Sequence, residues 1–428
     1  MFVRRDTRRL VAELPRHNPW PGDLPAIMMD DRWRTNQHTL LCREDAAMVR
    51  ATWCVLAMLV LALPASAQDA KPKMANNAIL VGWDGAHRDH VKALLKDGKL
   101  PNLQKLISAG ALVDINVTSG ATDTKAGWSQ ILTGYRPEIT GVYSNGRFRD
   151  IPAEYSIFAR LRAQYGADQI ATVATIGKKS HCGEIDAPFK RPYDPAKEPA
   201  AQPAKKKKAR QQAAQAAPPK KARKQAAQPG AKKNLNRGKV VEENGKTFLV
   251  FDGSPYHSMS KNADVWRFGL TRDEAVGDEA LAMLDKFGRK PFFFFVHFAE
   301  VDHSGHRHGE PSKEYDEAVI SGDKQLGRIV EKLSQLGVAD KTLIYVTADH
   351  GFDVGKSGHG NAPLVFLGTN DKQVTRNGSR ADIAPTILDR LGVNLAKLTP
   401  PLDGESLARP ATKPAVNDVL PKRKRKAA

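Results

Sequence analysis

Six side chains in this sequence are candidate ligands for divalent metal ions, which carboxylate and imidazole groups commonly bind. Three are aspartates and three are histidines, which is enough to hold two ions and leave room for a substrate. Bound ions of this kind can polarise a substrate and activate an attacking oxygen. Four of the six stand in the motifs AspHisSerGlyHis and ThrAlaAspHisGly. The full set is Asp84, Asp302, His306, Asp349, His350 and His359.

Each of the three aspartates follows a predicted strand. Short apolar runs bounded by polar residues indicate strands. They lie at 78–83, 170–176, 247–251, 292–298, 342–347 and 363–367. Asp84 comes directly after the first of these runs, Asp302 follows the fourth and Asp349 follows the fifth. Because ligands collect at the carboxyl ends of strands in open α/β sheets, we expect the aspartates to converge on one crevice.

Amphipathic stretches between these runs predict helices. They lie at 87–97, 102–108, 153–164, 272–286, 314–336 and 381–391. Strands that alternate with helices are typical of a mostly parallel central sheet with helices on both faces. The fold class is therefore α/β, with one catalytic domain over residues 75–410. The hydrophobic content of 41% is ordinary for a soluble globular protein.

Basic residues are concentrated in two stretches of the chain. Between Lys205 and Lys239 there are thirteen Lys or Arg and no Asp or Glu, and residues 422–426 add five more. These stretches account for nearly all of the formal net charge of +19. Residues 195–237 consist almost wholly of Ala, Lys, Gln, Pro and Arg, which cannot bury enough apolar surface to offset the entropy of ordering. We predict a disordered low-complexity insertion within the domain, and a basic tail at 411–428.

The beginning of the chain is typical of a targeting segment. Arg50 precedes an apolar run of eleven residues at 53–63, and AlaSerAla ends at Ala67. A basic start, a short apolar run and such a cleavage site indicate a signal peptide. A membrane-spanning helix needs about 20 apolar residues. We predict a signal peptide at 48–67, an upstream or unstructured extension at 1–47, and a periplasmic or secreted product. An uncleaved membrane anchor is the alternative.

Cysteine usage points away from disulfides. Only one of the three cysteines, Cys182, lies beyond the predicted signal peptide. A single cysteine cannot form an internal disulfide. Bound metal ions are therefore the expected cross-links. Imidazole and carboxylate ligands suit zinc best, with manganese or iron as alternatives.

With these motifs, the sequence resembles the alkaline phosphatase superfamily, and within it the sulfatase and type I phosphodiesterase (nucleotide pyrophosphatase) branch. The resemblance covers most of residues 79–391, apart from the insertion. It implies an alkaline-phosphatase-like fold and two divalent ions. The ligands implied for the first ion are Asp84, Thr124, Asp349 and His350. The ligands implied for the second ion are Asp302, His306 and His359.

The resemblance also implies a nucleophile, which must be Thr118, Thr122 or Thr124. Type I phosphodiesterases place ThrGly nine and ten residues after the nucleophile and an Asn twenty-one residues after it. Counting from Thr124 reaches ThrGly at 133–134 and then Asn145, whereas counting from Thr122 does not. The formylglycine sulfatases carry Cys at this position, followed by a ProSerArg-like turn. The run ThrLysAlaGly found here cannot make that cofactor.

Elementary chemistry gives these residues their roles. A threonine hydroxyl is a poor nucleophile at neutral pH and needs an activator, which a coordinated divalent ion provides. If Thr124 opens a helix that runs to Leu132, the free amides and the positive end of that helix also favour phosphoryl oxygens. Asn145 is expected to donate a hydrogen bond to a non-bridging oxygen. The alternatives are a helix cap for the threonine and a turn for the asparagine.

A further substrate contact is expected in GlyLysLysSerHis, residues 177–181, which follows a predicted strand. The motif resembles the GlyLysxHis element with which sulfatases hold the sulfate, although a one-residue shift is needed to reach its histidine. Lys178 is the expected anion contact, with a solvent-exposed lysine as the alternative. His87 and His297 carry no motif of their own.

Three functional hypotheses remain. The first is a hydrolase of phosphate mono- or diesters that forms a covalent phosphothreonine. The second is a sulfate or phosphonate ester hydrolase, because tetrahedral anions make the same demands on a site. The third is a polyanion-binding protein that uses the basic stretches at 205–239 and 422–426 through counterion release. Because neither stretch has interleaved aromatics, we interpret both as a weakly specific accessory tether and expect no specific nucleic-acid reader.

Overall fold

The computed structural model describes residues 76–195 and 238–412. The predicted signal peptide and upstream extension lie outside these residues, as do nearly all of the basic insertion and the basic tail, so those assignments stay predictions. Within the described residues, no helix is both long and apolar enough to cross a membrane. Cys182 is buried and forms no disulfide with any part of the chain that the structure describes.

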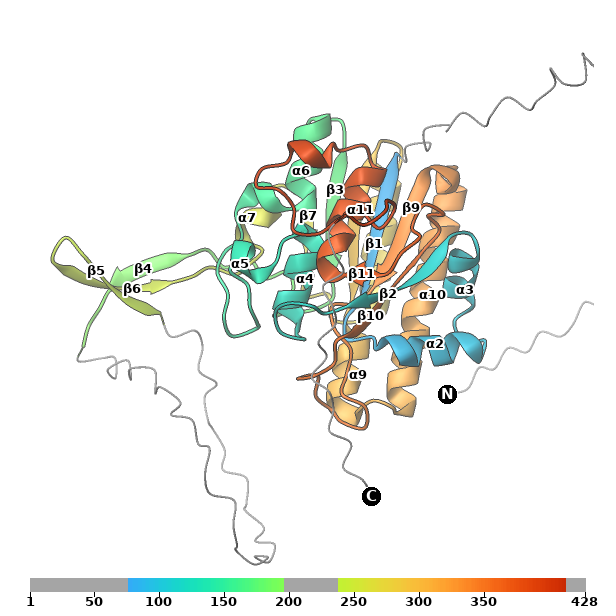
Figure 1. Ribbon diagram of the computed structural model, residues 1–428, viewed down its shortest axis with the longest axis horizontal. Helices are drawn as coiled ribbons and strands as arrows, with labels where there is room; N and C mark the ends of the chain where they lie inside the picture. The colour runs from blue at the N-terminus through green and yellow to red at the C-terminus, as the bar shows by residue number, and fades with distance from the viewer. Residues whose placement is uncertain (1–75, 196–237, 413–428) are drawn as a thin grey trace, which may run out of the picture. The chain divides into compact units, whose positions relative to one another are not determined.

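An eight-stranded sheet lies at the centre of the described chain, with the strand order β11-β2-β10-β9-β1-β8-β3-β7 (Figure 1). β1 runs parallel to both of its neighbours, β8 and β9, and β3 runs parallel to β8 and β7. β10 is antiparallel to β9 and β2. The strands are β1 Asn77–Trp83, β2 Ala111–Asn116, β3 Ala171–Ile176, β7 Val265–Arg267, β8 Phe292–Phe298, β9 Thr342–Thr347, β10 Leu364–Thr369 and β11 Gly378–Ser379. The predicted mostly parallel sheet is confirmed.

Five of the six predicted strands belong to this sheet, but the assignment of 247–251 to it was wrong. That segment is β6 (Lys246–Phe251), which pairs antiparallel with β4 (Phe189–Pro192) and β5 (Lys239–Glu243) in a separate three-stranded sheet. The reason is the turn between β5 and β6, where Asn244 and Gly245 both have positive φ. An AsnGly pair of this kind joins two adjacent antiparallel strands into a hairpin.

Helices cover both faces of the central sheet, as predicted (Figure 1). One face carries α2 Arg88–Lys96, α3 Pro101–Ser108, α8 Asp273–Phe287, α9 Glu300–His308 and α10 Lys313–Gln335. The other carries α4 Thr124–Thr133, α6 Ile157–Tyr165 and α11 Ile383–Arg390. The shorter helices are α5 Pro137–Thr140, α7 His257–Ser260, η1 Ala153–Tyr155, η2 Ala339–Lys341, η3 Arg380–Asp382 and η4 Leu395–Lys397. All six predicted helices are present, and α9 was not predicted.

Two neighbouring residues at the end of β1 show how the layers fit together. Side chains of a strand alternate between its two faces, so Gly82 and Trp83 face opposite helices. On one face the ring of Trp128 from α4 occupies the space that a side chain at Gly82 would need. On the other face Trp83 packs where α10 has Gly322, whose Cβ would lie 2.9 Å from the indole nitrogen. Each large ring therefore requires a glycine opposite it.

This packing makes a prediction for Gly82→Ala. The added methyl group would overlap the Trp128 ring, and overpacking of a core costs about 1–3 kcal/mol. The urea midpoint of unfolding should fall by a corresponding amount. Gly146→Ala is the matched control, because no atom lies within 4 Å of its Cβ position. Equal midpoints for Gly82→Ala and the unmodified protein would contradict the packing described here.

Candidate active site

The polar residues expected at strand ends do come together. Asp84 follows β1, Asp349 and His350 follow β9, and Lys178 follows β3. Asp302 lies on α9, which begins two residues after β8. These four strands are adjacent in the sheet and run parallel, so their carboxyl ends meet at one edge.

The Lys178 side chain lies at the centre of this group. Its Nζ is 2.7 Å from an oxygen of Asp84 and 2.8 Å from an oxygen of Asp302. The same Nζ donates to the Thr124 hydroxyl at 2.8 Å. Only 6% of the Lys178 side chain is exposed, so the solvent-exposed alternative for this lysine was wrong. One buried ammonium group thus joins both aspartates to the expected nucleophile.

The second oxygen of Asp84 is held by two residues that the sequence did not single out. His297 Nε2 lies 2.8 Å from this oxygen, and Trp128 Nε1 donates to it at 3.1 Å. His297 stands directly opposite Gly82 in the register of β8 with β1. This pairing brings the imidazole to the end of β1 that carries Asp84, and no local sequence signal reveals it.

Charges within the group shift its pKa values. Burial alone would raise the pKa of Asp84, but Lys178 and His297 outweigh it and hold that pKa well below its ordinary value. The pKa of Asp349 is raised well above its ordinary value by burial and by the nearby Asp84 charge. Burial would lower the pKa of Lys178, yet the two aspartates beside it raise it, so this amine stays charged.

All three predicted histidine ligands are oriented by their Nδ1 atoms. His306 Nδ1 lies 3.0 Å from the carbonyl of Ser357, and His350 Nδ1 lies 2.9 Å from the carbonyl of Gly351. His359 Nδ1 bonds the carbonyl of Thr122. A carbonyl can only accept, so each Nδ1 carries the proton and each Nε2 has a free lone pair. This is the usual arrangement of metal-binding histidines.

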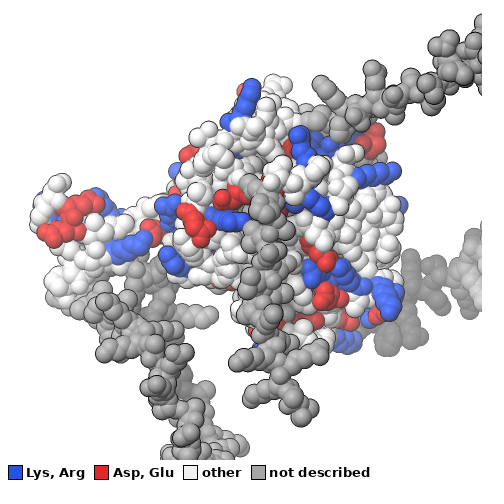
Figure 2. All heavy atoms as spheres, viewed as in Figure 1, with Lys and Arg blue, Asp and Glu red and all other residues white. Residues whose placement is uncertain are grey.

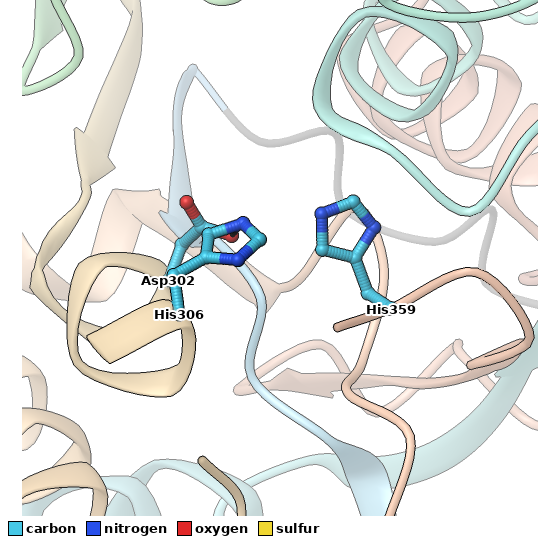
Figure 3. Close-up of side chains that lie close together, drawn as sticks. All are labelled: Asp302, His306 and His359. Carbon is cyan, nitrogen blue, oxygen red and sulfur yellow. Dashed lines mark ion pairs between the residues drawn. The ribbon is translucent and has the colours of Figure 1, made fainter. Parts of the chain in front are cut away.

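The ligand atoms form two compact groups. One consists of Asp302, His306 and His359, whose side chains point toward one another from α9 and from the loop after β9 (Figure 3). The other consists of Asp84, Asp302 and His350. Within each group the ligand atoms lie within 4.8 Å of one another. The first group is the set implied for the second ion, and in the other group Asp302 stands where Thr124 and Asp349 were expected.

Unpartnered buried atoms show that this group fits divalent ions. His350 Nε2, Asp302 Oδ1 and Asp349 Oδ2 are buried without a hydrogen-bond partner among the described residues. A buried polar atom without a partner is costly, and a metal ion satisfies such atoms. Asp349 Oδ2 lies 3.4 Å from His350 Nε2, while its other oxygen accepts from Gly85 N–H at 3.1 Å. Asp349 thus lies beside the group formed by Asp84, Asp302 and His350, and its Oδ2 has no hydrogen-bond partner among the described residues.

Thr124 is the first residue of α4, as expected, and 1% of it is exposed. The free helix amides expected to bind phosphoryl oxygens are largely used within the protein. Asn145 Oδ1 accepts from Lys125 N–H at 2.8 Å, and Asp123 accepts from Ala126 N–H at 3.3 Å. That expectation was wrong for these two amides, because the capping aspartate and Asn145 already satisfy them. The Asn145 amide nitrogen faces His181 at 3.5 Å.

Thr122, one of the three threonines considered as nucleophile, has a different place. Its hydroxyl donates to the carbonyl of His359, and its own carbonyl bonds Nδ1 of the same histidine. This pair of bonds fixes His359 against the segment that leads into α4. Thr122 therefore positions an expected ligand, which agrees with the spacing argument that favours Thr124.

Arg380, which the sequence did not reveal, connects the segment that leads to Thr124 with the segment that follows β9. Its guanidinium is fully buried and donates to the carbonyls of Ser119 at 2.7 Å and Ala121 at 3.1 Å. It also donates to the carbonyl of Asp349 at 2.9 Å. The residues that lead to Thr124 are thereby tied to the residue that follows β9.

The start of α9, which carries Asp302, is held by a reciprocal pair of side chains. Asp273 accepts from the N–H groups of Ala299 at 3.0 Å and Glu300 at 3.2 Å. Glu300 in turn accepts from the N–H of Asp273 at 3.1 Å. Burial and the nearby Glu300 charge raise the pKa of Asp273 to about 8. The first turns of α8 and α9 are thus locked together.

A family model described as "Type I phosphodiesterase / nucleotide pyrophosphatase" matches residues 78–387. This family is a branch of the alkaline phosphatase superfamily. Since the model matches more than half of the chain, the protein belongs to the type I phosphodiesterase / nucleotide pyrophosphatase family. The resemblance inferred from the motifs is confirmed.

Curated relatives match parts of the chain. The 2,3-bisphosphoglycerate-independent phosphoglycerate mutase of Malacoplasma penetrans is 31% identical over 132 residues, which cover 28% of this chain and 24% of that protein. The enzyme of the same name from Paracoccus denitrificans is 29% identical over 184 residues, covering 40% and 33%. The steryl-sulfatase of Mus musculus is 35% identical over 99 residues, covering 21% and 15%. The chain thus spans no more than 33% of the length of these relatives.

Solved structures resemble the chain at low identity. A putative sulfatase from Bacteroides thetaiotaomicron is 12% identical with a TM-score of 0.47, covering 79% of this chain and 75% of that chain. The phosphonate monoester hydrolase of Agrobacterium radiobacter is 16% identical with a TM-score of 0.44, covering 77% and 76%.

The raised pKa of Asp273 predicts a pH-dependent stability. Its folded pKa of about 8 lies above the unfolded value, so its contribution is fully present below the unfolded pKa and is lost as pH rises toward 8. Asp273→Asn keeps the acceptor for both N–H groups and cannot ionise. Urea midpoints measured between about pH 5 and about pH 9 should therefore fall more for the unmodified protein than for the variant. Parallel curves for the two proteins would contradict this.

The buried guanidinium of Arg380 leads to a prediction about metal retention. Arg380→Met should loosen the backbone at Asp349, because the carbonyls of Ala121 and Asp349 lose their donor while that of Ser119 keeps Gln130. Metal retention should weaken by roughly tenfold or more, a typical loss when an outer-shell partner is removed. Retention is measured by metal analysis after dialysis against increasing chelator.

Arg376→Met is the matched control for this loss. Arg376 also donates to backbone carbonyls, none of them in the site, which are those of Asn377, Glu405, Ser406 and Arg409. The control should lose stability and keep its metal. Equal metal loss in both variants would show that Arg380 has no specific role in the site.

Proposed function

We propose that this protein is a metal-dependent hydrolase of phosphate mono- or diesters in which Thr124 forms a covalent phosphothreonine. The observation that carries the proposal is the place of the Thr124 hydroxyl. It is buried at the start of α4, 2.8 Å from Lys178 Nζ, which also reaches Asp84 and Asp302. Membership of the type I phosphodiesterase / nucleotide pyrophosphatase family supports hydrolysis of a phosphate ester or a related ester.

The residues present fit two divalent ions, for which zinc is the most suitable and manganese or iron are alternatives. The proposed ligands of the first ion are Asp84, Thr124, Asp349 and His350. Those of the second ion are Asp302, His306 and His359. When bound, such ions polarise a phosphoryl oxygen and lower the pKa of an attacking hydroxyl. Support comes from the three buried unpartnered atoms of the site and from the free Nε2 atoms of its histidines.

The chain's own residues bind and orient the reacting groups. Thr124 Oγ attacks phosphorus, the bond from phosphorus to the leaving oxygen breaks, and the alcohol departs. Water then attacks the phosphothreonine, restores the hydroxyl and releases phosphate or a monoester. Lys178 donates to Thr124 Oγ and so stabilises negative charge that develops there. Asn145, whose amide oxygen is fixed on α4, keeps its amide nitrogen as a donor for a non-bridging oxygen.

Sulfate or phosphonate esters are the alternative substrates, since the local similarity to a steryl-sulfatase concerns the same superfamily. The threonine favours phosphate. The formylglycine sulfatases carry Cys where this chain has Thr124, so sulfate transfer by that route would lack its nucleophile.

Thr124→Ala tests the proposal directly. Hydrolysis of the best substrate in a panel of aryl phosphate monoesters, diesters, phosphonates and sulfates should fall by about a thousandfold or more, because a covalent nucleophile is removed. Acid-quenched protein should contain a phosphorylated peptide that includes residue 124, and the variant should not. Full activity of Thr124→Ala would show that the nucleophile is another residue.

Thr124→Ser is the control that separates loss of the hydroxyl from a change in side-chain size, because serine keeps the hydroxyl.

Dialysis of the unmodified protein against a chelator should abolish hydrolysis, and added zinc should restore it. Hydrolysis that survives complete metal removal would contradict the metal-dependent mechanism. A preference for sulfate esters in the panel would favour the alternative substrate class.

Export through the segment 48–67 and contact with polyanions through 205–239 and 422–426 stay proposals from the sequence. The polyanion contact is secondary to hydrolysis, because the proposed ligands, nucleophile and substrate contacts all lie outside the basic stretches.

A further inference from the structure

A cavity of 490 Å³ lies beside the turn that follows Asn145. One wall is the turn at 143–149, and the opposite wall is formed by β5 and β6 of the three-stranded sheet. Figure 2 shows positive and negative side chains next to one another where this small sheet joins the body. Six side chains give the cavity its chemistry. They are Tyr143, Phe148 and Phe251 with Arg147, Arg149 and Lys239.

Two contacts connect the wall of the cavity to Lys125, the residue that follows the expected nucleophile. Asn145 holds the N–H of Lys125 at 2.8 Å, and the next residue after Asn145, Gly146, lines the cavity. Consecutive Cα atoms are about 3.8 Å apart, so the cavity wall begins one residue from a side chain that bonds the Thr124 helix. In addition, Lys125 Nζ lies 4.3 Å from the centre of the Phe148 ring.

The three cations of the cavity differ in how they are satisfied. Lys239 pairs with Asp252 at 2.6 Å. Arg149 donates to two carbonyls of α5, at 3.1 Å and 2.9 Å. The Arg147 guanidinium lies over the Tyr143 ring, 3.9 Å from its centre, and forms no ion pair with a carboxylate within residues 76–195 and 238–412. A stacked guanidinium keeps its edge free for bidentate bonds to a planar anion.

We propose that this cavity binds the second ester group of a phosphodiester substrate, and that this group contains a ring with a carboxylate or phosphate of its own. The inference rests on the proposed function, because it places the scissile phosphorus at Thr124. In this proposal, the group attached to that phosphorus is directed past Asn145 toward Gly146, which lines the cavity. The rings then contact the ring of the substrate, and Arg147 binds its anionic group.

Size and composition agree with this class of ligand. Sites for small organic molecules are about 300–1,000 Å³ and combine apolar or aromatic walls with a few polar groups. Aromatic side chains favour a ring over an alkyl group through stacked or edge contacts. Glu138 and Asp252, which also line the cavity, disfavour a group with a positive charge.

Three p-nitrophenyl phosphodiesters test the inference, with methyl, phenyl or 4-carboxyphenyl as the second group. For the unmodified protein, kcat/KM should rise by roughly tenfold from methyl to phenyl, as expected when a pocket fits an added apolar group. It should rise by roughly another tenfold from phenyl to 4-carboxyphenyl, as expected for a charge-assisted bidentate bond. Arg147→Glu, at an exposed position, should reverse the preference for 4-carboxyphenyl over phenyl.

Lys246→Glu is the matched control, because it reverses a positive charge at an exposed position on β6 of the same small sheet without lining the cavity. In this control, the ratio of kcat/KM for the 4-carboxyphenyl ester to kcat/KM for the phenyl ester should equal that of the unmodified protein. Equal kcat/KM for all three esters, or the same loss of ratio in both variants, would overturn the inference while leaving the proposed function intact.

A protein that hydrolyses none of the three esters would refute the diester form of the proposed function and leave the monoester form to be tested. Calorimetric titration then tests binding in the cavity without hydrolysis. The unmodified protein and Arg147→Glu are each titrated with 4-carboxyphenyl phosphate and with phenyl phosphate. Tighter binding of the carboxylate that is lost in Arg147→Glu supports it, and equal binding overturns it.

Discussion

The carboxylate of Asp84 is the group on which the site depends, because a fully buried negative charge is tolerated only where several partners surround it. Lys178 supplies the opposite charge, and His297 and Trp128 supply hydrogen bonds. These partners come from the end of β3, from β8 and from α4. Satisfying one side chain therefore fixes the relative positions of two strands and a helix, and the same helix begins at Thr124.

The packing of the sheet serves the same end. α4 can approach β1 closely enough for Trp128 to reach Asp84 because Gly82 leaves room for the ring. On the opposite face, Gly322 gives Trp83 the same room, which seats α10 against the strand. The distances within the site thus follow from the fit of rings against glycines several residues away from any reacting group.

Local pattern was sufficient for much of this protein. The apolar runs that form β1, β8 and β9 are each followed within four residues by an aspartate, so the meeting of Asp84, Asp302 and Asp349 could be predicted once a parallel sheet was expected. His297 could not, because its role depends on which strand lies beside β1. Arg380 could not either, since its partners are backbone carbonyls distant in sequence. The AsnGly turn before β6 was a local signal that was not used, and it would have separated that strand from the central sheet.

All ten residues of α4 are buried, including both of its polar first residues. A helix enclosed in this way exchanges its amide hydrogens only when much of the domain unfolds, so it belongs to the most slowly exchanging part of the molecule. Motion that accompanies substrate entry or product release must therefore arise elsewhere. The loop that carries His359 and the turn at 143–149 are more exposed than α4, and hydrogen bonds of Thr122 and Asn145 tie them to the start of that helix. Such motion is therefore expected in these two segments, at the cost of those contacts, while the nucleophile keeps its place.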